Sequence, residues 1–93
     1  MRRRRGPMET SEYIEDFLIR IIRRAGVRVS EGDGTDLAAL VRARHELEEA
    51  EAKAVQAMRD RYGYSWAYIG RELGITRQSA EQRYNKRIRA LAS

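Results

Sequence analysis

The stretch Ser65–Leu91 limits the possible folds more than any other part of this chain, because two runs of helical periodicity flank a glycine. In the first run, Trp66, Ile69 and Leu73 recur at helical spacing and are expected to face a core. The second run consists of Ala80, Tyr84, Ile88 and Leu91. Gly74 lies between the runs, where a residue without a side chain adopts positive φ freely. The pattern predicts two helices joined by a tight turn, a helix-turn-helix.

Local signals support this reading at each end of the two helices. Ser65 and Thr76 stand where a hydroxyl can accept a hydrogen bond from the first free amides. Gly70 stands four residues before Gly74, at the point where the helices should cross with little room. Ile69, Leu73, Ile75 and Ala80 supply the apolar positions that lock the crossing.

The second helix has two chemically different faces when its residues are placed at about 100° per residue. The apolar run faces the core. The opposite face consists of Gln78, Gln82, Asn85 and Arg89, flanked by Glu81 and Lys86. A merely solvated face more typically carries glutamate and lysine, whereas carboxamides and arginine are the groups that bind adenine and guanine edges. The outer face therefore predicts contact with DNA bases in the major groove.

Two sets of contact residues follow from this placement. The N-terminal part of such a helix usually enters the groove deepest, so that part and the outer face should read bases. The expected base-reading residues are Arg77, Gln78, Ser79, Gln82, Arg83 and Asn85. Cationic and hydroxyl groups at the edges should contact phosphates, which position a protein without specifying sequence. The expected backbone contacts are Tyr68, Arg71, Thr76, Lys86, Arg87 and Arg89. Arg83 lies on a flank and could do either, and Tyr68 is expected to point away from the core face.

The segment IGRELGITRQSAEQRYNKRIRAL resembles the promoter-reading fourth region of bacterial primary sigma factors, whose typical form is IGRxFxVTRERIRQIExKALRKL. The resemblance implies that Arg77, Gln78, Glu81 and Gln82 meet DNA bases. The family has glutamate where Gln78 stands and arginine where Glu81 stands, so its base preference should not transfer. Its isoleucine after the glutamine is Arg83 here, with Tyr84 taking the apolar role. The segment is also similar to small helix-turn-helix proteins of high-GC Gram-positive bacteria and their phages.

The resemblance covers about 28 residues and leaves the first sixty unassigned. The chain lacks the regions with which sigma factors bind core polymerase and melt promoters, so a complete sigma factor is not expected. The alternative to DNA binding is a protein-interaction module that imitates this region and docks on RNA polymerase or a sigma factor.

The upstream part is expected to contain a basic arm, residues 1–8, and a helical scaffold, residues 9–62, that serves for dimerisation; residues 63–93 form the helix-turn-helix unit. The arm could follow phosphates or a minor groove, be an artefact of the start site, or be a tail without a specific role. A first helix should begin with Thr10 or Ser11 as its cap and end near Gly26. Its apolar stripe comprises Tyr13, Ile14, Phe17, Leu18, Ile21 and Ile22.

A connector with a short extended piece at 27–29 should lead to a long helix from Thr35 or Asp36 to Tyr62, ended by Gly63. Small residues at Ala50, Ala54 and Ala57 suit close helix packing. Such a helix would be roughly 40 Å long at 1.5 Å per residue, whereas a compact domain of this size is only about 30 Å across. The helix should therefore break near 44–49 or pack on a second chain, and a homodimer is favoured.

The charge is distributed unevenly along the chain. Residues 1–8 carry +4, residues 9–62 carry nine basic and twelve acidic groups, and residues 63–93 carry six basic and two acidic groups. Two cationic ends suit a polyanionic partner. Arginine makes up 17 of the 19 basic residues, and its planar fork suits bidentate contacts to phosphate or guanine.

Several function classes are not expected. There is no cysteine and His45 is the only histidine, so neither a catalytic site nor a metal site is expected, and no nucleotide-binding loop suggests an enzyme or a cofactor. No apolar run is long enough for a membrane span. The expectation is an all-α, cytoplasmic, nucleoid-associated protein that binds double-stranded DNA sequence-specifically as a small transcriptional regulator.

Overall fold

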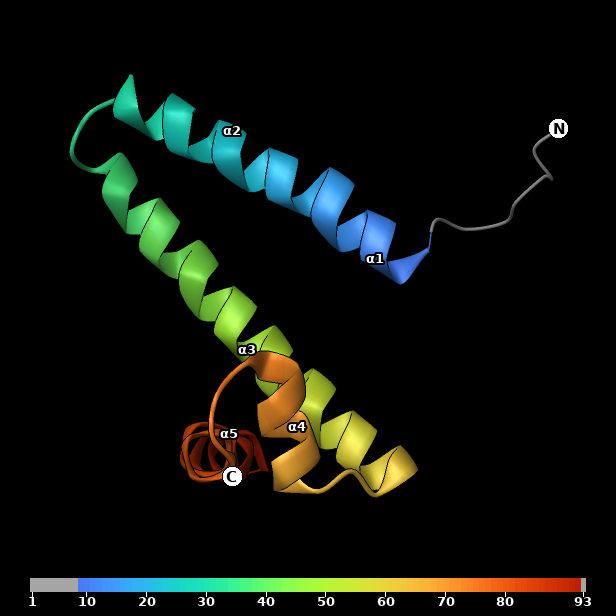
Figure 1. Cartoon of the computed structure of the whole chain (residues 1–93). Coiled ribbons are helices and arrows are strands. Elements are labelled where there is room, and N and C mark those ends of the chain that lie inside the picture. The colour runs from blue at the N-terminus through green and yellow to red at the C-terminus, as the bar shows by residue number, and fades with distance from the viewer. Residues whose placement is uncertain (1–8, 93) are drawn as a thin grey trace, which may run out of the picture. The chain divides into compact units, whose positions relative to one another are not determined.

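The computed structural model describes residues 9–92 and shows an all-α protein, as the sequence predicts (Figure 1). The elements are α1 (Thr10–Glu12), a π-helical turn η1 (Tyr13–Leu18), α2 (Ile19–Ser30), α3 (Asp36–Tyr62), α4 (Trp66–Leu73) and α5 (Arg77–Ala92). The chain divides between Arg42 and Ala43 into two compact units, so α3 begins in the first and ends in the second. The arm expected at 1–8 lies outside the described residues.

The first helix is longer than the sequence predicts at its C-terminal end. It begins at Thr10, where the Glu9 amide donates to Oε1 of Glu12 at 3.3 Å, so Glu9 takes the capping position expected for Thr10 or Ser11. Its continuation α2 runs through Gly26 and ends at Ser30, so the expected stop and the extended piece at 27–29 are both wrong. One glycine inside a helix costs only about 1 kcal/mol. A single glycine therefore does not by itself end the helix, and the Ser30 hydroxyl donates to the Val27 carbonyl at 2.6 Å in the last turn.

The apolar stripe of this first helix is largely exposed among the described residues of its own unit. In η1 the Ile19 amide bonds the Ile14 carbonyl, five residues back, and the rings of Tyr13 and Phe17 lie 5.5 Å apart. Leu18 is half-buried, whereas its larger neighbours along the stripe are exposed. No side chain among residues 9–42 is fully buried.

A short turn over residues 31–35 leads into α3, which is a single unbroken helix from Asp36 to Tyr62, as predicted. In the turn, Oδ1 of Asp33 accepts a hydrogen bond from the Thr35 amide at 2.9 Å, and the bonds from Thr35 lower the pKa of Asp33. The break considered near residues 44–49 does not occur. Gly63 ends the helix with φ of 69°, as predicted.

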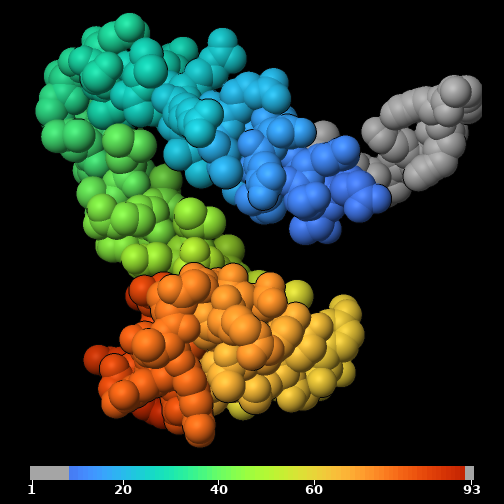
Figure 2. All heavy atoms as spheres, in the orientation of Figure 1, coloured from blue at the N-terminus to red at the C-terminus, as the bar shows by residue number. Residues whose placement is uncertain are grey.

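The second unit has a small core shared by α3, α4 and α5. Its buried side chains are Ala52, Trp66, Ile69, Ala80 and Tyr84, with Val55, Tyr64, Tyr68, Ile75, Ile88 and Leu91 packed around them. Figure 2 shows the atoms of α4 lying directly against the later part of α3. The α3 residue buried here is Ala52, whereas Ala50, Ala54 and Ala57 are exposed, which corrects the expected packing face. The position of α4 and α5 on α3 decides which small residue is covered.

Leu73 also differs from its expected place. It shares the face of Trp66 and Ile69 but is 44% exposed, because α4 ends there and the chain turns away toward α5. Apolar residues at helical spacing predict which face of a helix is buried, but not how far along the helix the neighbouring elements cover that face.

The turn between α4 and α5 follows the predicted chemistry. Oγ of Ser65 accepts from the Tyr68 amide at 3.1 Å, and Gly74 adopts φ of 75°. The Ile75 amide donates a hydrogen bond to the Gly70 carbonyl at 2.9 Å, which caps the C-terminal end of α4. A Cβ atom at Gly70 would lie 2.8 Å from the Ile75 carbonyl oxygen and 2.9 Å from that of Thr76. Both neighbours are backbone atoms, so the crossing is as close as the sequence predicts.

No helix in the described part of the chain combines the length and the apolar content needed to cross a membrane.

Substitution of Gly70 by alanine should destabilise the second unit by about 1–3 kcal/mol, because the new methyl group would overlap two backbone carbonyls that cannot move independently. Urea unfolding followed by circular dichroism measures the change. Gly26→Ala is the matched control, since it lies inside α2 with nothing within 4 Å of the new Cβ. That control should stabilise its helix by about 0.5–1 kcal/mol. A Gly70→Ala variant as stable as the parent would contradict the close crossing.

Candidate nucleic-acid interface

Helix α5 has one face in the core and one face open to solvent. Ala80 and Tyr84 are buried, and Ile88 packs beside them. The opposite side chains gather around a shallow surface depression. Its lining residues are Gln78, Glu81, Gln82, Asn85, Lys86 and Arg89. The structure therefore brings together three of the expected base-reading carboxamides with two of the expected phosphate contacts.

The first turn of α5 is also accessible. Oγ1 of Thr76 accepts from the Ser79 amide at 3.0 Å, so Thr76 caps the helix as predicted. Arg77 and Ser79 are exposed in this turn. The capping bond fixes the start of α5, and Gln78 in the same turn is exposed as well.

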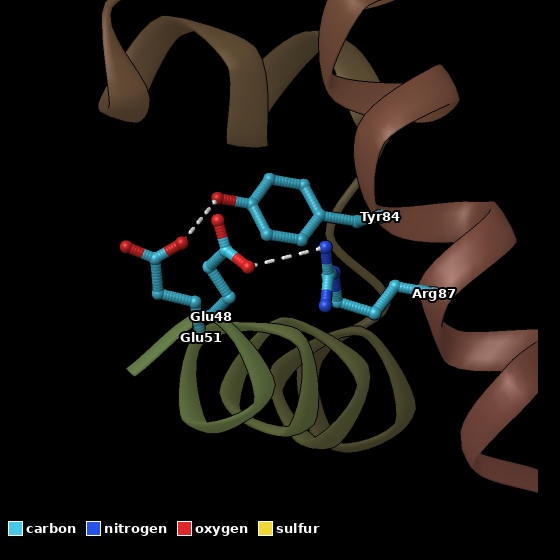
Figure 3. A network of polar contacts seen from close by, with 4 residues as sticks. All are labelled: Glu48, Glu51, Tyr84 and Arg87. Atoms are coloured by element: carbon cyan, nitrogen blue, oxygen red, sulfur yellow. Dashed lines mark hydrogen bonds and ion pairs between the residues drawn. The ribbon is translucent and has the colours of Figure 1, made fainter. Parts of the chain in front are cut away.

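Two expected contact residues, Arg83 and Arg87, lie on the side of α5 that meets α3. Nη2 of Arg87 lies 3.5 Å from Oε1 of Glu48, with the two side chains 39% and 40% exposed (Figure 3). The Tyr84 hydroxyl donates to Oε1 of Glu51 at 3.2 Å in the same network. The guanidinium of Arg83 lies 5.8 Å from the centre of the Tyr84 ring.

This network holds Arg87 against an acidic surface. Any phosphate that Arg87 meets must compete with Glu48 for it, whereas Lys86 on the outer face lies in no such pair with α3. The spacing along α5 alone could not show this difference, because Glu48 is nearly forty residues earlier in the chain.

Tyr68 and Arg71 belong to an aromatic cluster at the start of α4. The Tyr68 ring lies 4.4 Å from the Tyr64 ring, and the Arg71 guanidinium lies 5.5 Å from the centre of Tyr68. Tyr68 is half-buried against the core, which corrects the expectation that it points away, because the loop residue Tyr64 fills the space beside it. Desolvation raises the pKa of Tyr64, with a further contribution from Tyr68, so this hydroxyl stays neutral at ordinary pH.

Sequence reasoning missed Arg59, which fixes the entry to α4. Its guanidinium lies 4.1 Å from the centre of the Trp66 ring, and its Nε donates to the Tyr64 carbonyl at 3.1 Å. Arg59 precedes Trp66 by seven residues, but Gly63 ends the helix between them. Helical spacing therefore does not relate the two positions. The contact ties the end of α3 to the first residue of α4.

Among residues 9–92 no three side chains of the histidine, cysteine, aspartate or glutamate types gather in a way suited to hold a metal ion.

The described fold is that of an all-α protein whose last two helices form a helix-turn-helix supported by α3. Comparison of the chain with protein-family models, with curated proteins and with solved structures gives no match.

Arg59→Ala should destabilise the second unit by about 1–2 kcal/mol, because it removes both the cation–π contact and a charged hydrogen bond. Arg59→Lys should recover only part of the loss, since lysine keeps the charge but not the Nε donor. Arg61→Ala, at an exposed residue 5.9 Å from Tyr62, should change stability by less than about 0.5 kcal/mol. Thermal unfolding of the three variants measures this order; equal losses at Arg59 and Arg61 would contradict it.

Proposed function

We propose that this protein binds double-stranded DNA sequence-specifically, with α5 as the reading helix in the major groove, and acts as a small transcriptional regulator. The observation that carries the proposal is the composition of the outer face of α5. Gln78, Gln82 and Asn85 line one depression there with Lys86, while the other face of the helix is fixed in the core.

The helix-turn-helix geometry supports the proposal. The major groove is about 12 Å wide and admits one α-helix, provided that no other element blocks its outer face. The capped turn and the close crossing at Gly70 hold α5 on α4 without covering that face. The sigma-like sequence pattern described above is consistent with this use of the helix.

The proposed contacts divide by chemistry. Carboxamides can form paired hydrogen bonds with adenine, and arginine forms them with guanine. Gln78, Gln82 and Asn85 are therefore assigned to bases, together with Arg77. Lys86 and Arg71 are assigned to phosphates, which set the position of the helix in the groove. Arg87 contributes only as far as phosphate displaces Glu48.

A homodimer would place two reading helices on half-sites about 34 Å apart, one turn of the duplex. The mechanism proposed for regulation is steric or architectural.

Selection of bound sequences from a random duplex pool tests the division of roles. Gln82→Ala should relax the preference at one base position, with a loss of about 1–3 kcal/mol of discrimination there. Lys86→Ala should weaken binding to all selected sequences by a similar factor. Gln56→Ala removes the same carboxamide group from α3 and should leave the selected sequences unchanged.

Equal, sequence-independent losses of affinity for Gln82→Ala and Lys86→Ala would contradict the assignment of Gln82 to base contacts. Absence of duplex binding by a folded parent chain, even at low salt, would argue against DNA as the partner. That result would favour docking on RNA polymerase or a sigma factor, which retention of the association after nuclease treatment would then support.

The affinity for the selected duplex should fall steeply with salt, because each phosphate contact releases counterions. Lys86→Ala should reduce the slope of log K against log salt concentration by about 0.9, the change expected for one lost contact. Gln82→Ala should leave the slope unchanged. Fluorescence anisotropy titrations over a range of salt concentrations measure all three slopes; a parent slope near zero would contradict the proposed phosphate contacts.

A further inference from the structure

The described part of the first unit, residues 9–42, consists mainly of one long helix and the start of α3. No side chain among residues 9–42 is fully buried. Most helical stability in proteins comes from packing of an apolar face rather than from helix propensity. The first helix therefore needs a surface that covers its stripe.

The stripe is large enough to form an interface. Its exposed large residues leave 42–51% of their surface open to solvent. They are Tyr13, Ile14, Phe17, Ile21 and Ile22. Together they make an apolar strip of several hundred square ångströms, comparable with the largest patch of a typical monomer, about 300–600 Å².

The charges on the same helix are separated by sign along its length. The first half carries only acids and the second half only bases. The acids are Glu9, Glu12, Glu15 and Asp16, and the bases are Arg20, Arg23, Arg24 and Arg28. Two copies packed in opposite directions would place each acidic half beside a basic half, twice in one symmetric interface. Two copies packed in the same direction would place like charges together.

We propose that the apolar strip on Thr10–Ser30 is a homodimer interface in which the helices of two copies pack antiparallel. This interface would form the homodimer named in the proposed function. The interface itself does not depend on DNA binding. A second copy brings its own basic half to the acidic half of the strip.

The helix dipole is a simpler explanation of the charge separation, and a variant with both halves reversed distinguishes it from an antiparallel pair. Acids near the start of a helix and bases near its end also stabilise that helix through its dipole. Reversing the charges of both halves would oppose the dipole at both ends and so destabilise the helix more than either single reversal. In an antiparallel pair the same double reversal restores attraction between the halves.

Sedimentation equilibrium of the full chain without DNA tests the interface. The parent should be dimeric at micromolar concentration. Glu15→Arg with Asp16→Arg should weaken dimerisation by about tenfold or more, since each copy then brings like charges together. Arg23→Glu with Arg24→Glu should do the same. The combined fourfold variant should recover affinity to within about threefold of the parent. Circular dichroism confirms in each case that the helices remain.

A monomeric parent at a concentration of several hundred micromolar would overturn the proposal. A combined variant as weak as either pair of reversals would overturn the antiparallel arrangement and leave the dipole as the cause.

Disulfide cross-linking tests the direction independently, because the chain contains no cysteine. Leu18→Cys lies near the middle of the strip and should cross-link to its partner copy. Ser11→Cys lies near one end and should not, because an antiparallel partner places residue 11 far from itself. Cross-linking of Ser11→Cys would indicate a parallel pair and overturn the arrangement. Neither assay involves DNA, so failure of the DNA-binding proposal and failure of the dimer remain distinguishable.

Discussion

The close approach of the Gly70 backbone to the carbonyls of Ile75 and Thr76 is the contact on which the second unit depends. It sets how near α5 can lie to α4, and so which α5 side chains reach the core. With Ala80 and Tyr84 drawn inward, the carboxamides of the same helix must project outward. A position without a side chain thus permits the close packing of α4 and α5 from which these carboxamides project.

Helix α3 has two roles in this unit. It supplies Ala52 to the core, and it lays an acidic surface along one flank of α5. Glu48 pairs with Arg87 and Glu51 accepts from Tyr84, so the arginines of α5 are not equivalent. Arg87 is partly neutralised by Glu48, whereas Lys86 forms no such pair with α3. Under the proposed function, α3 would therefore take part in selecting which groups of α5 meet DNA.

Local chemistry made much of the fold predictable. The caps at Ser65 and Thr76 and the left-handed glycines at 63 and 74 each depend on one residue and its immediate neighbours, and the structure confirms all four. Contacts between distant residues were not predictable. The burial of Ala52 and the pairing of Arg87 require the placement of α3 against α5, and no spacing within one helix contains that information. The missed continuation of α2 past Gly26 shows that a glycine marks a helix end only when its surroundings also favour one.

The position of Trp66 allows the unfolding of the two units to be distinguished by spectroscopy. It is the only tryptophan in the chain, and it lies buried beneath Arg59 in the second unit. Its emission therefore reports the integrity of the helix-turn-helix alone, whereas far-ultraviolet ellipticity counts every helix. A temperature at which ellipticity falls while Trp66 emission stays constant would correspond to melting of the Thr10–Ser30 helix by itself. The chain thus contains an internal probe for whether its two parts unfold together or in sequence.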